Sequence, residues 1–237
     1  MAGPTVILVH GAFCGGWAFE RFSAAFAAKG LTPSAPDLRG HEPGAGPSAT
    51  VGVSMADYAA DLTALIARED EPPIVIGHSL GGLAAQMAAA RAPVRALVLL
   101  APSSPWGVAG GTLEEAISAV SLYALGAYWA QSIEPDFGAA QAYSLDRMPE
   151  SERRAVFARM ARESGRALFE TLNWWLDPLM TTSVAARAIA APVLAIAGER
   201  DRVHPPATVA QIAERYGGVT HVMTGMSHWL IGEPGWE

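Results

Sequence analysis

The sequence has a single cysteine, little positive charge and no long apolar run. Because Cys14 stands alone among 237 residues, an intramolecular disulfide framework and a multi-cysteine metal site are both excluded. Fifteen arginines and one lysine oppose twenty-three acidic residues, so the formal net charge is −7. No cluster of basic residues interrupts this balance, and we therefore expect neither nucleic acid nor an anionic membrane as a partner. No apolar segment approaches the roughly 18 residues that a membrane span requires.

The residues that are present favour one globular α/β domain. Hydrophobic residues make up 51% of the chain and charged residues 16%, so a large core can be buried. Because a strand-like run begins at residue 5, no room is left for a signal peptide, and we expect a cytoplasmic protein. Short apolar runs alternate with helical stretches, and they lie at residues 5–9, 31–37, 73–77, 94–100, 192–197 and 219–223.

Near-continuous apolar strands that alternate with helices are typical of a parallel sheet covered on both faces. Ser54 and Asp57 have the spacing of a capping box, which predicts a helix from Met55 onward. The sequence therefore predicts an α/β fold, with a mostly parallel sheet of about six strands flanked by helices.

Residues 105–187 lack any strand-like run. Helices are predicted to open at residues 112–115, to include residues 156–160, and to include residues 168–175. We interpret this segment as a helical lid inserted into a core formed by residues 1–104 and 188–237. Such a lid would cover the carboxyl ends of the strands, where open α/β sheets bind ligands.

The run Gly77-His78-Ser79-Leu80-Gly81 matches the pattern G-x-S-x-G. A predicted strand precedes it and a predicted small-residue helix follows, which is the context of a nucleophile elbow. A sharp turn there would expose the hydroxyl of Ser79, and the small residues on either side would let neighbouring backbone approach. We therefore predict that Ser79 is a nucleophile.

A serine nucleophile needs a base and a group that orients the base. Asp201 follows the strand predicted at residues 192–197, and His228 follows the strand predicted at residues 219–223. Because parallel strands end at one edge of the sheet, both side chains are expected beside Ser79. Glu199 is a less favoured alternative for the acid, since it lies two positions too early.

Two further segments resemble the α/β-hydrolase superfamily. Residues 10–17 have the sequence HGAFCGGW, and residues 37–41 have the sequence DLRGH. The first is similar to a loop of the small plant-esterase and hydroxynitrile-lyase branch and its bacterial relatives. This resemblance implies an oxyanion hole made by the backbone N–H groups of Ala12 and Leu80, with Phe13 a less favoured donor. It also implies a final helix after His228; only nine residues follow here, so we expect that helix to be absent or the chain to be truncated.

The aromatic residues give the only indication of substrate. The candidates for lining a substrate pocket are Phe13, His78, Trp106, Trp129, Trp175 and Trp229. Arginines at 153, 154, 159, 162 and 166 are interspersed with acids, which indicates a solvated helix face and no anion clamp. His41, His204 and His221 are interpreted as ordinary loop or strand residues. We therefore predict hydrolysis of a small neutral apolar or aromatic ester by water.

No metal or cofactor is expected, because neither H-E-x-x-H nor H-x-x-E-H occurs in the chain. Cys14 is interpreted as a packed thiol. The oligomeric state is left open.

Other functions share the same three residues. A lyase of the plant type would also use a lid lysine, whereas the single lysine of this chain is Lys29. A C–C hydrolase, a perhydrolase and a small-molecule receptor with slow turnover remain as alternatives.

Overall fold

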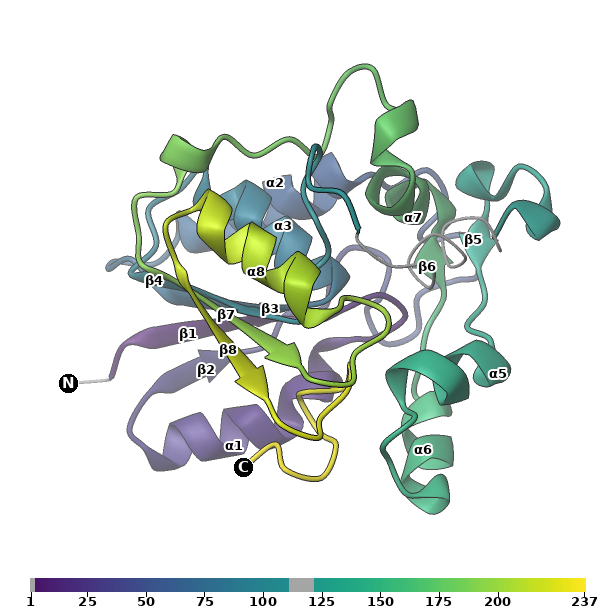
Figure 1. Cartoon of the computed structure of the whole chain (residues 1–237), viewed down its shortest axis with the longest axis horizontal. Coiled ribbons are helices and arrows are strands. Elements are labelled where there is room, and N and C mark those ends of the chain that lie inside the picture. The colour runs from purple at the N-terminus through teal and green to yellow at the C-terminus, as the bar shows by residue number, and fades with distance from the viewer. Residues whose placement is uncertain (1–2, 111–121) are drawn as a thin grey trace.

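The computed structural model describes residues 3–110 and 122–237 and is built around a six-stranded sheet (Figure 1). All five strand pairings in this sheet are parallel. The strands, in spatial order, are β2 (Thr32–Ser34), β1 (Thr5–Val9), β3 (Ile74–His78), β4 (Ala96–Leu100), β7 (Val193–Gly198) and β8 (Val219–Met223). The α/β fold predicted from the sequence is therefore confirmed.

The apolar run at residues 31–37 predicts a longer strand than the structure contains. β2 spans three residues at the edge of the sheet. Pro33 and Pro36 lie in this run, and a proline has no N–H to donate to a neighbouring strand. Pairing is therefore limited to the few residues that register with β1.

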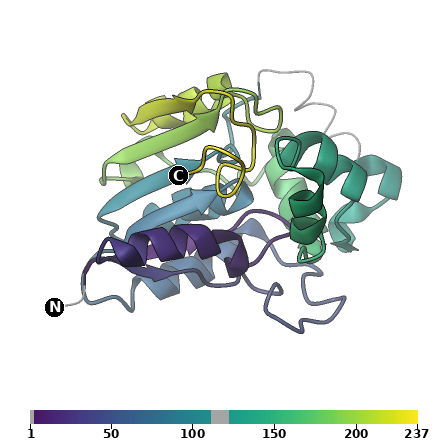
Figure 2. The ribbon, with the colours of Figure 1, turned by 90° about the horizontal axis from the view of Figure 1, so that it is seen from below.

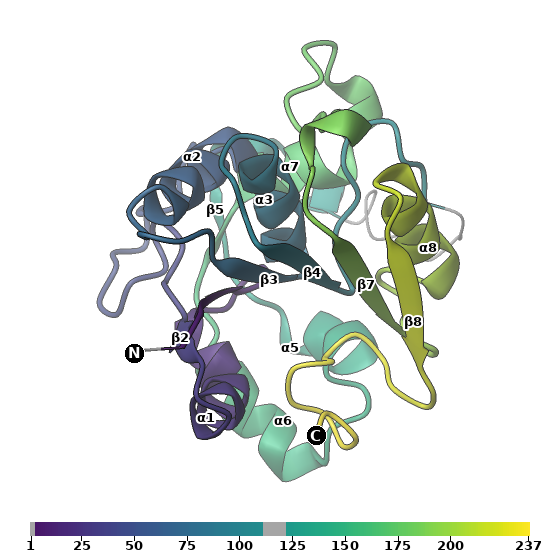
Figure 3. The same ribbon diagram turned by 90° about the vertical axis from the view of Figure 1, so that its left-hand side faces the viewer.

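The sheet separates two apolar cores because alternate residues of a strand face opposite sides. Ile7 and Val9 of β1 belong to the first core, whereas Val6 and Leu8 belong to the second. Helices α2, α3 and α8 cover the first face, and α1 covers the other (Figure 3). The core helices are α1 (Glu20–Ala28), α2 (Met55–Ile66), α3 (Leu80–Ala89) and α8 (Pro206–Arg215).

The predicted capping box at the start of α2 is present. The Ser54 hydroxyl accepts a hydrogen bond from the Asp57 N–H at 3.1 Å, and the Asp57 carboxylate accepts one from the Ser54 N–H at 2.9 Å. Both bonds satisfy N–H groups that a helix leaves without partners at its first turn. No helix of the described ranges is long and apolar enough to cross a bilayer.

Residues 105–187, which connect β4 to β7, are called the insertion. Its described residues 122–172 gather beyond one end of the sheet (Figure 2). Its helices are α5 (Phe137–Ala139), α6 (Glu150–Phe157) and α7 (Gly165–Leu172), with short turns at Leu122–Leu125, Tyr128–Ala130, Ala140–Ser144, Trp174–Leu176 and Ala186–Ala188. The helix predicted to open at residues 112–115 lies outside the described residues.

Two details of the insertion correct the sequence prediction. It contains a pair of antiparallel strands, β5 (Ser132–Ile133) and β6 (Glu163–Ser164), where no strand was predicted. Two-residue strands are too short to produce an alternating pattern. In addition, Met160 lies beyond the end of α6, and Trp175 lies in a separate turn after α7.

The chain after His228 packs on the second core without forming a helix. Trp229, Leu230 and Ile231 are buried there, and residues 229–237 run through turns.

Candidate active site

Ser79 lies between β3 and α3 with a strained backbone. Its φ of 52° and ψ of −123° are uncommon for a residue with a side chain. Two glycines permit the turn: a Cβ on Gly81 would lie 2.1 Å from the His10 carbonyl oxygen, and one on Gly77 would lie 2.6 Å from the Gly81 carbonyl oxygen. The small residues of the G-x-S-x-G run therefore allow backbone contacts that any larger side chain would block.

The structure brings Ser79, His228 and Asp201 together. The Ser79 Oγ lies 3.1 Å from the His228 Nε2, and the His228 Nδ1 lies 2.9 Å from the Asp201 Oδ2. All three side chains are buried. They come from the ends of β3, β8 and β7, so the convergence follows from the parallel order of the sheet.

Asp201 is held as a carboxylate. Its Oδ1 accepts hydrogen bonds from the N–H groups of Val203 at 2.8 Å and His204 at 3.0 Å. Burial opposes ionisation, but the adjacent His228 and these hydrogen bonds outweigh it and lower the pKa of Asp201. An ionised Asp201 fixes the Nδ1 of His228 as a donor and leaves its Nε2 free to accept a proton.

Two further imidazoles flank His228. The ring centroids of His78 and His204 lie 5.0 Å and 5.3 Å from that of His228. Burial, reinforced by the neighbouring His228, lowers the pKa of His78 to about 3 and that of His204 to about 4, so both are neutral at pH 7. The His78 Nε2–H donates to the His228 carbonyl oxygen at 2.9 Å, and the His204 Nε2 lies 3.0 Å from the Ser103 hydroxyl. His204 therefore lies in a loop, as expected, but it is buried beside His228.

The loop that carries His228 also makes a hydrogen bond with Glu233, near the C-terminus. The Glu233 carboxylate accepts a hydrogen bond from the Ser227 N–H at 2.6 Å. The other oxygen of Glu233 is buried without a partner in the described part of the chain. Burial raises the pKa of Glu233 to about 7. The sequence offered no signal for this contact, because a single glutamate near a chain end is ordinarily solvated.

The two amides predicted to form the oxyanion hole are available. Neither the Ala12 N–H nor the Leu80 N–H has a hydrogen-bond acceptor among the residues that the structure describes. In contrast, the Phe13 N–H donates to the Glu163 carboxylate at 3.3 Å, which removes it as a donor. Gly11 brings the loop close to Ser79, since a Cβ there would lie 3.0 Å from the Ser79 Cβ.

A cavity of about 670 Å³ opens above Ser79, between the sheet and the insertion. Three of the six predicted pocket residues line it, namely Phe13, His78 and Trp229. Its other apolar walls come from Cys14, Leu122, Leu125, Ile133, Ala139, Ala140, Tyr143 and Met160. Residues of the insertion thus provide most of the wall that faces Ser79.

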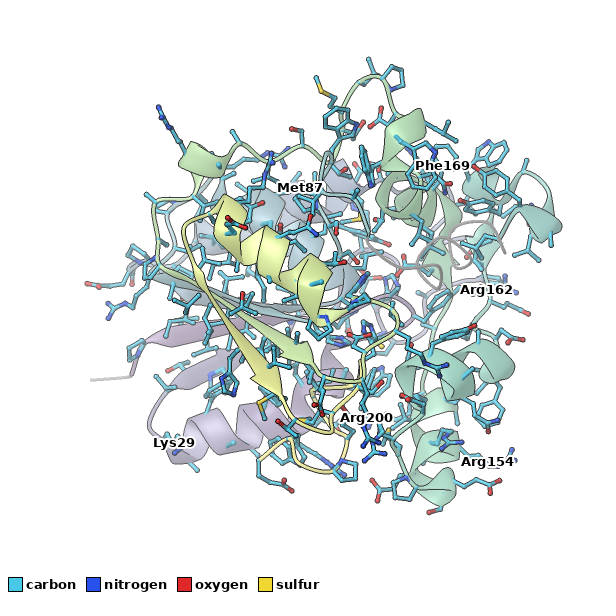
Figure 4. The ribbon with its side chains drawn as sticks, in the orientation of Figure 1. Lys29, Met87, Arg154, Arg162, Phe169 and Arg200 are labelled. Atoms are coloured by element: carbon cyan, nitrogen blue, oxygen red, sulfur yellow. The ribbon has the colours of Figure 1, made fainter. Side chains whose placement is uncertain are left out.

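The prediction was wrong for the other three aromatic residues. Trp106 packs on Trp174 and donates from its Nε1 to the Asp177 carbonyl oxygen at 3.2 Å. Trp129 is 43% exposed and packs on Phe169, which is labelled in Figure 4. Trp175 is 53% exposed. These rings pack on other aromatic side chains and not on the cavity. Helical spacing in the sequence does not say which face of a lid lines the cavity.

The five arginines do not form one solvated helix face. Arg162 lines the cavity, pairs with Glu134 and donates to the Ser132 carbonyl oxygen at 3.1 Å. Arg153 donates to the carbonyl oxygens of Leu145 and Met148. Arg162 and Arg154 lie well apart in Figure 4. Because the charge of Arg162 is matched by Glu134, the cavity wall presents no free cation at this point.

The remaining candidates lie apart from the reacting groups. Glu199 is exposed and accepts a hydrogen bond from the Gly225 N–H at 2.7 Å, so it does not orient His228. Burial raises the pKa of the Cys14 thiol far above its usual value, which makes that group a poor nucleophile. Within the described ranges, no group of three or more His, Cys, Asp or Glu side chains is arranged to hold a metal ion.

The parallel sheet, the strained serine turn and the convergence of Ser79, His228 and Asp201 define an α/β hydrolase. The chain belongs to the Alpha/beta hydrolase family, whose model matches residues 6–236.

Individual proteins are similar to this chain over a short segment of sequence or in fold at low sequence identity. A pyrethroid hydrolase from Sphingobium wenxiniae is 38% identical over 82 residues, a match that covers 35% of this chain and 29% of that protein. A methylesterase from Arabidopsis has a TM-score of 0.74 at 17% identity, with 98% of this chain and 93% of that chain covered. Tomato methylketone synthase I has a TM-score of 0.75 at 19% identity, with 100% and 94% covered. At these identities the structural likenesses establish the fold alone.

Proposed function

We propose that this protein is a serine hydrolase that cleaves a small neutral ester through an acyl-enzyme on Ser79. The observation that carries the proposal is the continuous line of contacts from the Ser79 Oγ through the His228 imidazole to Asp201, at 3.1 Å and 2.9 Å. A base oriented in this way raises the nucleophilicity of a hydroxyl that is otherwise a weak nucleophile at pH 7.

The chemistry follows from the atoms in contact. The His228 Nε2 takes the hydroxyl proton while the Ser79 Oγ bonds to the ester carbonyl carbon. The Ala12 and Leu80 N–H groups donate to the resulting oxyanion, and losing one such donor typically costs about 2.7–4 kcal/mol of transition-state stabilisation. The intermediate collapses as His228 returns the proton to the departing alkoxide. Water then gives a proton to His228 and attacks the acyl carbon. His228 returns that proton to the Ser79 Oγ as the bond to the acyl carbon breaks, which releases the acid and restores the free enzyme.

The cavity favours a neutral apolar or aromatic substrate. Its wall near Ser79 is largely apolar, and its cation, Arg162, is already paired with Glu134. The name of a similar protein, the pyrethroid hydrolase, supports hydrolysis in general and not a particular substrate. Water is the second substrate. A lysine-assisted lyase step is not supported, because Lys29 lies at the end of α1 remote from the insertion (Figure 4).

A fluorophosphonate probe tests the nucleophile directly. We expect covalent labelling of the wild-type protein and none of Ser79→Ala. Ser103→Ala is the matched control, since Ser103 is a nearby buried serine that contacts His204 and not His228; this variant should label normally.

Turnover of aryl esters of increasing acyl length then tests the reaction class. Multiple turnovers with neutral esters, and a preference for them over charged esters, support the proposal. A folded protein that is labelled once but turns over no ester would contradict it and favour a small-molecule receptor. A preference for carbon–carbon bond cleavage or peracid formation would move the assignment to another reaction of the same three residues.

A further inference from the structure

Glu163 is a buried carboxylate that joins four segments of the chain. It lies in β6 of the insertion and has no exposed side-chain surface. Its Oε1 accepts hydrogen bonds from the Tyr58 hydroxyl at 2.7 Å and from the Ser164 N–H at 2.6 Å. Its Oε2 accepts one from the Phe13 N–H at 3.3 Å and lies 3.3 Å from the His41 Nε2.

The charge of this group is stabilised locally. Burial opposes ionisation of Glu163, but the adjacent His41 and the hydrogen bonds outweigh it and lower its pKa. Burial likewise opposes protonation of His41, and the carboxylate beside it raises the pKa of that imidazole. His10, whose ring centroid lies 5.1 Å from that of His41, is held neutral by burial, with a pKa lowered to about 4. His41 therefore lies in a loop, as expected, but it is buried against Glu163.

The insertion makes hydrogen bonds to both peptide groups that flank Phe13. The Phe13 N–H donates to Glu163, and the Phe13 carbonyl oxygen accepts a hydrogen bond from the Ala161 N–H at 2.8 Å. Phe13 itself has a φ of 63°, which is unfavourable for a bulky residue and persists only where surrounding contacts enforce it. The residue directly before it is Ala12, whose N–H faces no acceptor among the described residues.

We propose that Glu163 is a positioning residue for the oxyanion hole, which fixes the strained loop of residues 11–13 so that the Ala12 amide stays available to the reaction. This inference rests on the proposed function. Glu163 does not touch the reacting atoms; it acts through the Phe13 peptide. The insertion thereby completes the catalytic geometry as well as covering the cavity.

Substitution of Glu163 by glutamine isolates this role. Each carboxylate oxygen accepts from a backbone N–H, Ser164 on one side and Phe13 on the other, and a backbone N–H can only donate. An amide has one oxygen, so its NH₂ group must confront one of these donors. The shorter contacts to Tyr58 and Ser164 will keep the oxygen, which leaves the NH₂ group against the Phe13 N–H and releases the loop.

We expect Glu163→Gln to lower kcat by about 10- to 100-fold, the size of effect that a small misplacement of catalytic groups produces. KM should change by less than about threefold, because the cavity wall is retained. Affinity for an arylboronic acid, which forms a tetrahedral adduct on the serine, should fall in parallel with kcat. Affinity for the corresponding amide of the substrate should stay unchanged, since it binds without an oxyanion.

Glu170→Gln is the matched control. Glu170 is a second buried carboxylate of the insertion; it accepts a hydrogen bond from the Met55 N–H at 2.8 Å and pairs with Arg166, and it makes no contact with the loop of residues 11–13. This variant should lose stability but keep kcat and boronic acid affinity within about twofold. If Glu163→Gln does not fold, Tyr58→Phe removes one donor to the same carboxylate and should lower kcat by a smaller factor.

The outcomes separate the two proposals. Failure of the wild-type protein to react with a fluorophosphonate would reject the serine hydrolase function. Two results with a reactive wild type would reject the positioning role alone. One is a folded Glu163→Gln variant with unchanged kcat and unchanged boronic acid affinity. The other is an equal loss in Glu163→Gln and Glu170→Gln.

Discussion

Replacing Asp201 by asparagine should nearly abolish activity while leaving the site in place. The Asp201 Oδ1 accepts two backbone N–H groups, from Val203 and His204. The single oxygen of an asparagine must occupy that side, because its NH₂ group cannot accept. The NH₂ group therefore points at the His228 Nδ1, where the Asp201 Oδ2 now lies at 2.9 Å.

This orientation reverses the roles of the two imidazole nitrogens. The Nδ1 of His228 must accept from the amide, so the ring proton moves to Nε2. An Nε2–H can donate to the Ser79 hydroxyl but cannot take its proton. A change of this kind in a serine triad lowers kcat by about 10⁴-fold, which corresponds to about 5 kcal/mol in activation free energy.

Steady-state kinetics with a neutral aryl ester would measure this loss. Thermal unfolding should show that the variant is folded, and KM should change little because Asp201 lies behind the imidazole. Glu199→Gln is the matched control on the same loop, and it should retain kcat within about twofold. If Asp201→Asn kept more than a tenth of the wild-type kcat, the assignment of Asp201 as the orienting acid would be refuted.

Two other predictions follow from the site. The pKa of Glu233 is raised from 4.5 to about 7 in the folded protein, so the folded state binds this proton more tightly and loses stability as pH rises from about 4.5 to about 7. Glu233→Gln should remove that loss. The free energy of unfolding of the variant, relative to that of the wild type, should therefore be higher at pH 8 than at pH 5 by on the order of 1–3 kcal/mol. Denaturant unfolding at the two pH values measures this, and an equal difference at both would contradict it. Met160→Ala should raise KM for bulky apolar esters about tenfold, since Met160 is half-buried in the cavity wall and full burial of a methionine side chain contributes about 1.5–3 kcal/mol. Trp175→Ala, whose side chain is exposed and does not line the cavity, should leave KM within about twofold. Equal effects of the two substitutions would refute the assignment of the inward face.

The core of the site was predictable because its signals are local. A strand followed by G-x-S-x-G and a small-residue helix specifies the turn at Ser79, since steric contacts within a few residues decide it. Asp201 and His228 were predictable because each follows a strand, and parallel strands must end at one edge. Ala12 and Leu80 were expected only from the resemblance of residues 10–17 and of the serine turn to the α/β-hydrolase superfamily.

The partners of these residues were not predictable in the same way. Glu163, His41, Tyr58 and Phe13 meet only after the insertion folds against the core. The spacing of these residues in the sequence does not predict their contacts. A carboxylate is buried only where residues remote in sequence supply its hydrogen bonds and its countercharge. The same reason explains why three of the six predicted cavity residues, Trp106, Trp129 and Trp175, do not line the cavity.

The sequence by itself determined the fold class and the position of the strained serine turn, because hydrophobic periodicity and backbone sterics act over short distances along the chain. Only the tertiary structure decided which face of the insertion lines the cavity and which histidines stay neutral. It also decided which carboxylate holds the loop beside Ser79. Burial and charge pairing set those properties, and both depend on atoms that are remote in sequence until the chain has folded.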